Sequence, residues 1–315
     1  MSRPLVIQTE DLDRGPASWL AERCEFIACP FSDLPRFHQL LAKAQGLVVR
    51  TYTKVDAELL AKAPGLKVVA RAGVGLDNIN IPACRARGIE VVHTPGANTR
   101  AVVEYVSALI ADATRPRVYL DHVPTDAQWH DIRKSLNARR QLCEMTMGIC
   151  GLGRIGSQIA RVAAALDMRV IYHDLIDIPE SHRSGAGPVN FDTLLRESDI
   201  LTVHIDDRAS NRHIFNAAAF ARLKPDCLFL NTSRGFVIDD AALAAFLKGH
   251  PVATAMLDVH DPEPITPANP LLGLPNARLS PHIASATETA KRNMSWVVRD
   301  VWRVLNGERP EFPAP

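Results

Sequence analysis

Residues 148–175 read GICGLGRIGSQIARVAAALDMRVIYHDL, and this stretch decides the fold. An apolar run ends at Cys150, the glycines Gly151, Gly153 and Gly156 follow, and a helical pattern begins beside them. In such a strand–turn–helix unit the first glycine permits the tight turn, the second lets the backbone approach a pyrophosphate, and the third lets helix and strand pack closely. The helix N-terminus then presents N–H groups and a partial positive charge to the phosphates. The stretch therefore predicts a nucleotide-binding loop, with a purely structural turn as the alternative.

A single acid, Asp174, ends the next apolar run. It lies where a carboxylate binds the adenosine ribose hydroxyls of a dinucleotide. A carboxylate there repels a 2′-phosphate, so we expect NAD rather than NADP as the cofactor.

Short β-branched runs alternate with helical patterns along the whole chain, which predicts parallel sheets covered by helices on both faces. The strands show no polar alternation, so we expect both of their faces to be buried. The runs fall into two series, 4–8, 24–29, 46–50, 66–71 and 89–94, then 146–151, 169–174, 199–205, 227–233, 252–259 and 277–282.

We therefore expect an α/β protein with two doubly wound parallel-sheet domains. Residues 1–98 form a flavodoxin-like substrate-binding domain, and residues 99–285 form an NAD-binding Rossmann domain inserted in it. Residues 286–315 form one C-terminal helix that returns to the first domain. A long helix over 98–115 connects the two series, and the polar, basic segment 116–141 is interpreted as a partly helical arm.

Composition excludes several classes of protein. The 36 basic and 35 acidic residues leave no net field for nucleic acid or an anionic membrane. No apolar run is long enough to span a membrane and no secretory signal is visible, so we expect a cytoplasmic protein. The six cysteines have no metal-ligand spacing, and we expect no metal.

Three polar residues follow predicted strands of the second series: Arg234, Glu263 and His282. The carboxyl ends of parallel strands line the ligand crevice, so all three should face the nucleotide. Oxidation of a secondary alcohol needs a base for the hydroxyl proton, which suits histidine. A neighbouring carboxylate favours the protonated ring and orients it. An arginine can hold a substrate carboxylate. Taken singly, each also fits a structural or surface role.

Asp258 closes its strand and is a candidate acceptor for the nicotinamide amide, with a turn cap as the alternative.

The ordered segments RTYTKVD, RAGVGLDNI, HTPGANTRAVVEY, GLGRIG, LKPDCLFLNTSRG, MLDVHDPEP and SPHIASAT resemble the D-isomer-specific 2-hydroxyacid dehydrogenases. The resemblance runs from about Gly46 to Gly307. It implies that Arg234 binds the substrate carboxylate and carbonyl, that Glu263 partners His282, and that His282 donates the proton in reduction. It implies a homodimer joined through the NAD-binding domains. It also implies further cofactor contacts at Val74, Arg154, Ile155, Asp174, Ile205, Thr232, Ser233, Arg234, Asp258, His282 and Ala284.

The substrate should be a small anionic 2-hydroxy or 2-oxo acid held in the first domain. The Gly73–Val74–Gly75 loop can turn backbone N–H groups toward a carboxylate. Arg50 begins a segment similar to one that supplies a phosphate-binding arginine in phosphoglycerate dehydrogenases, so we expect 3-phosphoglycerate. A capping or surface role for Arg50, and glyoxylate or hydroxypyruvate as substrate, remain the alternatives. A different class, a non-enzymatic NAD(H)-sensing module, would need the nucleotide loop without the Arg–Glu–His set.

Several residues depart from the family pattern: Tyr52, Asp206, Asp207 and Phe236. The two acids should lie near the adenine edge of the nucleotide. The sequence ends soon after its last predicted helix, so we expect no appended regulatory domain.

Overall fold

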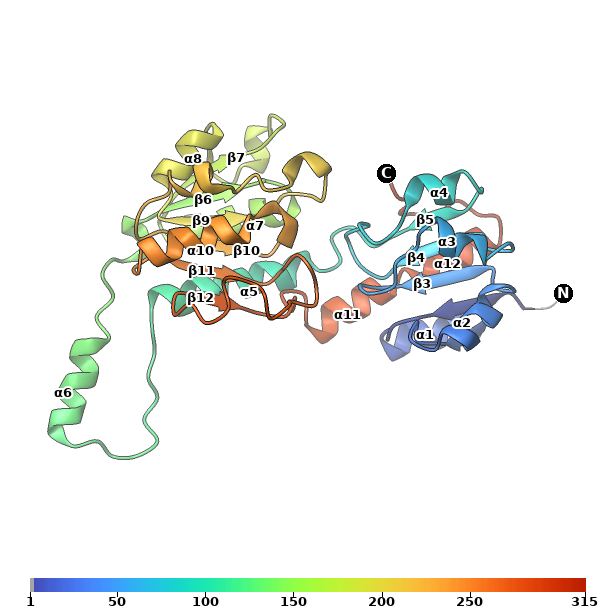
Figure 1. The fold of residues 1–315 in the computed structure, drawn as a ribbon, viewed down its shortest axis with the longest axis horizontal. Helices are drawn as coiled ribbons and strands as arrows, with labels where there is room; N and C mark the ends of the chain where they lie inside the picture. Colours follow the sequence, from blue (N-terminus) through green and yellow to red (C-terminus); the bar gives the residue numbers. More distant parts are fainter. Residues whose placement is uncertain (1–2) are drawn as a thin grey trace. The chain divides into compact units, whose positions relative to one another are not determined.

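The structure, a computed structural model, describes residues 3–315. The chain separates into two compact units, one comprising the chain up to Arg100 with Ser285–Pro315, the other comprising Ala101–Ala284. Each unit is built on one sheet in which all paired strands run parallel (Figure 1). The expectation of two parallel-sheet α/β domains is therefore confirmed.

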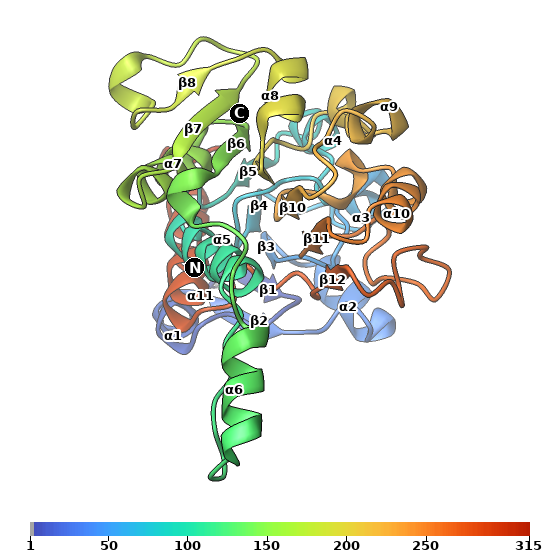
Figure 2. The same cartoon turned by 90° about the vertical axis from the view of Figure 1, so that its left-hand side faces the viewer.

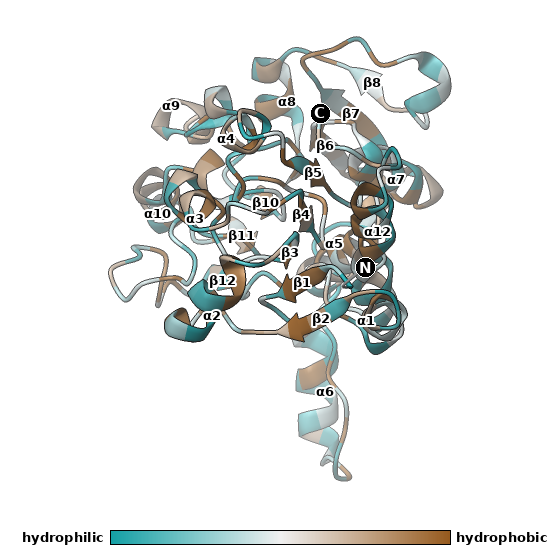
Figure 3. Cartoon of the chain, turned by 90° about the vertical axis from the view of Figure 1, so that its right-hand side faces the viewer, coloured by the Kyte–Doolittle hydropathy of each residue, from teal (hydrophilic) through white to brown (hydrophobic). Residues whose placement is uncertain are grey.

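The smaller unit has a five-stranded sheet in the order β2-β1-β3-β4-β5. Valines of the last helix, α12, pack on β3 and β4, and Figure 3 shows the apolar colouring of these strands. The elements of the unit are β1 (Leu5–Gln8), α1 (Arg14–Ala21), β2 (Glu25–Ala28), α2 (Leu34–Leu41), β3 (Gly46–Val49), α3 (Ala57–Ala61), β4 (Val68–Arg71), α4 (Ile81–Arg85), β5 (Glu90–Val92), α11 (Glu288–Ser295) and α12 (Val298–Leu305).

The single C-terminal helix predicted from the sequence is wrong in one respect: it is two helices, α11 and α12, separated at Trp296–Val297. The turn lets the buried Val297 join Val298 and Val301 in the core. Trp296 caps α11 and meets Trp19 of α1 edge-on, with ring centroids 6.1 Å apart.

The larger unit has a seven-stranded sheet in the order β12-β11-β10-β9-β6-β7-β8. The strand order reverses at β6, and ligands of such sheets bind beside the carboxyl ends of the strands at this point. The elements are α5 (Thr99–Thr114), α6 (Asp126–Ser135), η1 (Leu142–Glu144), β6 (Thr146–Cys150), α7 (Arg154–Ala165), β7 (Arg169–His173), η2 (Glu180–His182), β8 (Gly187–Pro188), α8 (Phe191–Glu197), β9 (Ile200–Val203), η3 (Ala209–Asn211), α9 (Ala217–Phe220), β10 (Leu228–Asn231), η4 (Gly235–Val237), α10 (Asp240–Gly249), β11 (Thr254–Leu257) and β12 (Ala277–Leu279).

Burial of the strands follows their place in the sheet. The central strands β3, β6, β9 and β10 are buried along their whole length. The edge strands β2 and β12 are partly exposed, contrary to the expectation that every strand is buried on both faces. An edge strand has a neighbour on one side only, so part of it stays in water.

The segment between α5 and β6 extends away from the large sheet and carries α6, as Figures 1 and 2 show. Thr125 and Gln128 form a capping box at the start of α6, and none of the helix residues is buried. Arg140 ties the returning chain to the buried Asp199, with Nη1 2.8 Å from Oδ1. Across residues 3–315, no helix combines the length and the apolar character needed to cross a membrane.

Candidate active site

The glycine loop follows β6 at the point where the strand order reverses. Gly151 has φ +90°, in the left-handed region, and its N–H donates to the His173 carbonyl at 2.8 Å. A Cβ on Gly151 would lie 2.6 Å from the carbonyl oxygen of His204, and one on Gly156 would lie 2.1 Å from that of Gly151. Both glycines are therefore required by close packing of the backbone itself.

Gly153 differs from its two neighbours. It is exposed, a Cβ there would meet nothing within 4 Å, and it precedes the first residue of α7 without any side-chain cap. A helix start that is open and lacks a capping side chain offers its N–H groups to an anion. The local geometry thus fits a pyrophosphate.

Asp174 lies beside this loop at the end of β7. Its Oδ2 accepts a hydrogen bond from the Leu152 N–H at 2.8 Å, and its Oδ1 accepts one from the Ile176 N–H at 3.3 Å. Each carboxylate oxygen has a second lone-pair direction, which suits the two hydroxyls of a ribose.

The loops after β10, β11 and β12 carry Arg234, Glu263 and His282. A Cβ on Gly235 would lie 2.0 Å from the backbone of His260, so the arginine loop touches the glutamate loop. Glu263 Oε2 lies 2.8 Å from His282 Nδ1, which joins the glutamate loop to the histidine loop. Arg234 Nη1 donates to the carbonyl of Ser233 at 2.8 Å. The three residues predicted from the sequence therefore lie on contiguous loops.

Glu263 is held in its ionised form. Burial raises the pKa of its carboxyl, but hydrogen bonds from His282 and from the backbone N–H of His260 outweigh burial and hold the pKa below its usual range. An ionised carboxylate can only accept hydrogen bonds, so Nδ1 of His282 is the donor in this contact and Nε2 is the ring nitrogen left to exchange a proton with a ligand.

The histidine loop rests on a buried acid, Asp258, which has no exposed surface. Its Oδ1 accepts from the Ser280 hydroxyl at 2.6 Å and from the Ile283 N–H at 2.9 Å, and its Oδ2 accepts from the Ala284 N–H at 2.7 Å. This is the geometry of a loop cap, the alternative considered for Asp258 beside a contact to the nicotinamide amide.

Two residues of this network were missed by the sequence analysis. His260 Nε2 lies 2.9 Å from the Ser280 carbonyl oxygen, and the Tyr105 hydroxyl donates to Ser280 Oγ at 2.9 Å. His260 lies within the quoted segment MLDVHDPEP, so its position next to Glu263 was an available signal. Tyr105 belongs to the connecting helix α5 and has no signal in its local sequence.

Among the other cofactor candidates, Thr232 stands out. Its hydroxyl is buried, and no atom of residues 3–315 forms a hydrogen bond with it. An unsatisfied buried hydroxyl is costly, and a bound ligand can satisfy it. Ser233 instead donates its hydroxyl to Asn231 at 2.7 Å. Ile205 and Ala284 lie on the loops that follow β9 and β12, and Arg154 and Ile155 are the first two residues of α7, directly after the glycine loop.

In the smaller unit, the Gly73–Gly75 loop follows β4. The Gly73 N–H donates to the Arg71 carbonyl at 2.8 Å, and the Val74 carbonyl lies 3.0 Å from His93 Nδ1. The amides of Val74 and Gly75 are thus the donors that this loop would offer to a carboxylate.

Arg50 follows β3 in the same unit, and its surroundings contain an unexpected acid. The Glu10 carboxylate accepts hydrogen bonds from four consecutive backbone N–H groups, those of residues 50–53, at 2.8–3.3 Å. The Arg50 side chain donates from Nη1 to the Asp11 carbonyl at 3.0 Å. Tyr52, one of the departures from the family pattern, is 73 % exposed.

Residues 107–284 match the model of the family described as "D-isomer specific 2-hydroxyacid dehydrogenase, NAD binding domain". A D-3-phosphoglycerate dehydrogenase of Archaeoglobus fulgidus is 38 % identical over 82 % of this chain, which spans 49 % of that protein. A glyoxylate reductase of Thermofilum pendens is 35 % identical over 98 % of this chain and 94 % of its own length. Among solved structures, D-lactate dehydrogenase of Aquifex aeolicus in complex with NAD and lactic acid superposes with a TM-score of 0.82 and 25 % identity, covering 96 % of each chain.

Proposed function

Because this chain belongs to the D-isomer-specific 2-hydroxyacid dehydrogenase family, we propose that it transfers hydride between NAD and a small D-2-hydroxy acid or its 2-oxo acid. The observation that carries the proposal is the 2.8 Å contact between Glu263 and His282 beside the Arg234 loop. A module that only senses NAD(H) has no need of this pair.

Each residue has a distinct task. Nicotinamide, when bound, supplies the hydride acceptor or donor. Arg234 binds the substrate carboxylate and polarises the reacting oxygen. His282 exchanges the proton of that oxygen through Nε2. Glu263 orients the ring and stabilises its protonated form. Thr232, Asp174 and the loop from Gly151 to Gly156 hold the nucleotide.

Rates with NADH against a panel of 2-oxo acids test this assignment. We expect turnover of at least one acid, and we expect His282→Ala to lower kcat by about two to four orders of magnitude with unchanged NADH affinity. His250→Ala is the matched control, because His250 is the C-cap residue of α10 and its ring nitrogen Nδ1 is hydrogen-bonded to the carbonyl of Phe246. Binding of NADH without turnover of any acid would favour the sensing module instead.

For the substrate, we propose 3-phosphoglycerate and 3-phosphohydroxypyruvate. The support is the 38 % identical relative named for this substrate and the place of Arg50 after β3. One observation favours smaller acids, such as glyoxylate or hydroxypyruvate, as the second candidate. Glu10 already occupies the backbone donors of residues 50–53, and Arg50 donates to a carbonyl of its own chain.

Arg50→Ala separates the two candidates. If Arg50 binds the phosphate, the variant should lose roughly 2–4 kcal/mol of transition-state stabilisation, measured from kcat/KM, with 3-phosphoglycerate. With glyoxylate the corresponding loss should be less than about 1 kcal/mol. Arg87→Ala serves as control, since Arg87 also donates to a backbone carbonyl, that of Leu60, but precedes β5 instead of following a strand. Equal losses for both substrates would assign Arg50 a structural role.

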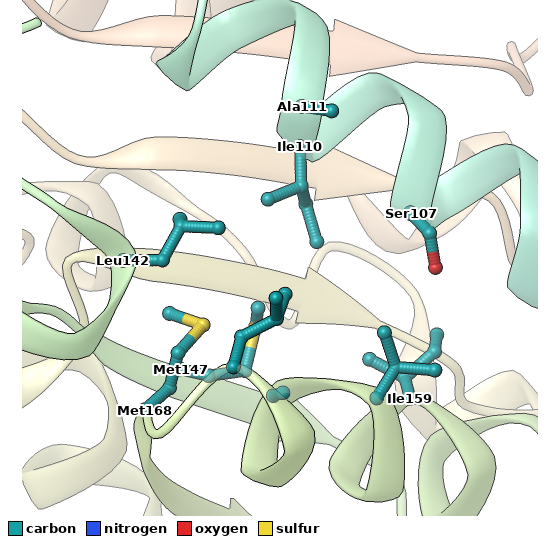
Figure 4. A pocket seen from close by; sticks show the side chains of 10 residues that line it. Ser107, Ile110, Ala111, Leu142, Met147, Ile159 and Met168 are labelled. Atoms are coloured by element: carbon teal, nitrogen blue, oxygen red, sulfur yellow. The ribbon is translucent and has the colours of Figure 1, made fainter.

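We further propose that the protein is a homodimer joined through the larger unit. The arm before β6 exposes apolar side chains, among them Tyr119 (84 %) and Val123 (94 %). An apolar groove lies between α5, α7 and β6, lined by Ile110, Met147, Ile159 and their neighbours (Figure 4). Exposed apolar surface of this kind is typical of interfaces. Light scattering of the Val123→Asp variant should reveal monomers, whereas an unchanged mass would exclude the arm from the interface.

A further inference from the structure

The segment His204–Ile205–Asp206–Asp207–Arg208 follows β9 and flanks the glycine loop. β6 lies between β7 and β9, so residues after these two strands lie on either side of Gly151. The close approach of Gly151 to the His204 carbonyl places this segment opposite Asp174. The side chains of Leu175 and Ile176, 65 % and 68 % exposed, offer an apolar face for an adenine ring beside Asp174.

Asp206 and Arg208 form a bidentate ion pair at this place. Arg208 Nε lies 2.7 Å and 3.0 Å from the two carboxylate oxygens of Asp206. Asn211 Nδ2 donates to Asp206 Oδ1 at 2.9 Å and to its carbonyl at 3.0 Å, which holds the acid in position. The ion pair thus lies in the segment whose residues Asp206 and Asp207 depart from the family pattern.

Arg208 is also within electrostatic reach of Asp174. The hydrogen bond and charge of Asp206 raise the pKa of the Arg208 guanidinium, and the charge of Asp174 acts in the same direction. Two acids and one arginine therefore share the region where a 2′-phosphate would lie. An arginine is the usual partner of such a phosphate, but here its guanidinium is already bound by Asp206.

We propose that Asp206 is a second determinant of cofactor choice, acting with Asp174: by binding Arg208 it withholds from a 2′-phosphate the cation that stands beside the adenosine ribose. The proposal rests on the nucleotide-binding role of the glycine loop. It predicts that discrimination against NADP depends on Asp206, which holds Arg208, as well as on Asp174, the proposed ribose ligand.

Calorimetric binding of 5′-AMP and of 2′,5′-ADP tests the proposal, because the two nucleotides differ only by the 2′-phosphate. The unaltered protein should prefer 5′-AMP. In Asp206→Asn, Arg208 is released, and the affinity for 2′,5′-ADP should rise about tenfold, with that for 5′-AMP within about twofold. Adding Arg208→Gln to this variant should abolish the gain, and Asp206→Glu should behave as the unaltered protein.

Glu197→Gln is the matched control. It removes an exposed acid that is paired with Arg169, and it changes the net charge by the same amount. Arg169 is the first residue of β7, so this pair lies at the amino ends of the strands, away from the glycine loop at their carboxyl ends. An equal rise for both nucleotides, a gain in the control, or a gain that survives Arg208→Gln would overturn the proposal. Absence of 5′-AMP binding by the unaltered protein would instead refute the nucleotide site itself.

Discussion

Glu263→Gln tests the chemistry of the site most directly, because it removes a charge while keeping the size of the side chain. The carboxylate lies 2.8 Å from His282 Nδ1 and also accepts from the His260 N–H at 2.9 Å. Glutamine can still accept both hydrogen bonds through its amide oxygen. The orientation of the ring is thereby preserved, and the electrostatic contribution is isolated.

The magnitude follows from Coulomb's law. Unit charges about 4 Å apart interact by about 4 kcal/mol at an effective dielectric constant of 20 and by about 1 kcal/mol in water. The side chains of His282 and Glu263 are 38 % and 25 % exposed, so screening by water is substantial. We therefore expect a loss of about 1–2 kcal/mol of transition-state stabilisation, which corresponds to about a tenfold fall in kcat/KM because 1.36 kcal/mol is a factor of ten in rate.

The sign is set by the direction of the reaction. Reduction needs the protonated imidazole, which the ionised Glu263 stabilises. Because hydrogen bonds hold the pKa of Glu263 below its usual range, this charge is present at neutral pH and is lost as pH falls through the lowered value. At neutral pH, kcat/KM for reduction should therefore be about tenfold lower in Glu263→Gln, and the difference from the unaltered protein should shrink in acid. The measurement is a profile of NADH-dependent reduction from about pH 5 to 9. Asp261→Asn, an exposed acid of the same loop paired with Arg212, should leave the profile unchanged. Full activity of Glu263→Gln at neutral pH would refute the reasoning.

Two further predictions concern stability and the glycine loop. Burial raises the pKa of Asp199, but hydrogen bonds from a backbone N–H, Lys224 and Arg140 outweigh burial and hold this pKa below its usual range. The ionised carboxylate therefore stabilises the fold above about pH 4, and this contribution is lost as pH falls through the lowered pKa. Asp199→Asn should reduce the free energy of urea unfolding by about 2–4 kcal/mol at neutral pH, with the difference from the unaltered protein shrinking in acid; a constant difference would exclude ionisation as the cause. Gly153→Ala should leave the unfolding midpoint unchanged while weakening NADH binding. Gly156→Ala should unfold the larger unit, because its Cβ would lie 2.1 Å from a backbone oxygen. Equal stability of the two variants would contradict this distinction.

The alternation of apolar runs and helical patterns predicted the sheets because strands buried in a parallel sheet are apolar throughout. Elements with weak local signals escaped this reasoning. α1 has only eight residues and contains Gly15 in its first turn, so its helical pattern is weak although Asp13 caps the helix. β8 comprises only Gly187 and Pro188, and it exists because β7 pairs with it. Such elements are determined by tertiary contacts.

The candidate site divides in the same way. Loop-borne groups were predictable because parallel strands deliver their carboxyl ends to one edge, which brings Glu263 to His282. Partners that approach from distant segments were not. Glu10 reaches the amides of residues 50–53 from the loop after β1, and Tyr105 reaches Ser280 across 175 positions in the sequence. Neither contact leaves a periodic or spacing signal.

The conformation of His282 explains why this site needs so much buried support. Its φ of +56° lies in the left-handed region, which costs a residue with a Cβ roughly 1–2 kcal/mol. Glycine would relieve the strain but has no imidazole, so the proposed proton-transfer group and the backbone conformation conflict at one position. Asp258 holds the loop in this conformation by accepting three hydrogen bonds from it, those of the Ser280 hydroxyl and of the Ile283 and Ala284 N–H groups. These contacts fix the loop in a geometry that brings Nδ1 to Glu263 and leaves Nε2 for the proposed substrate.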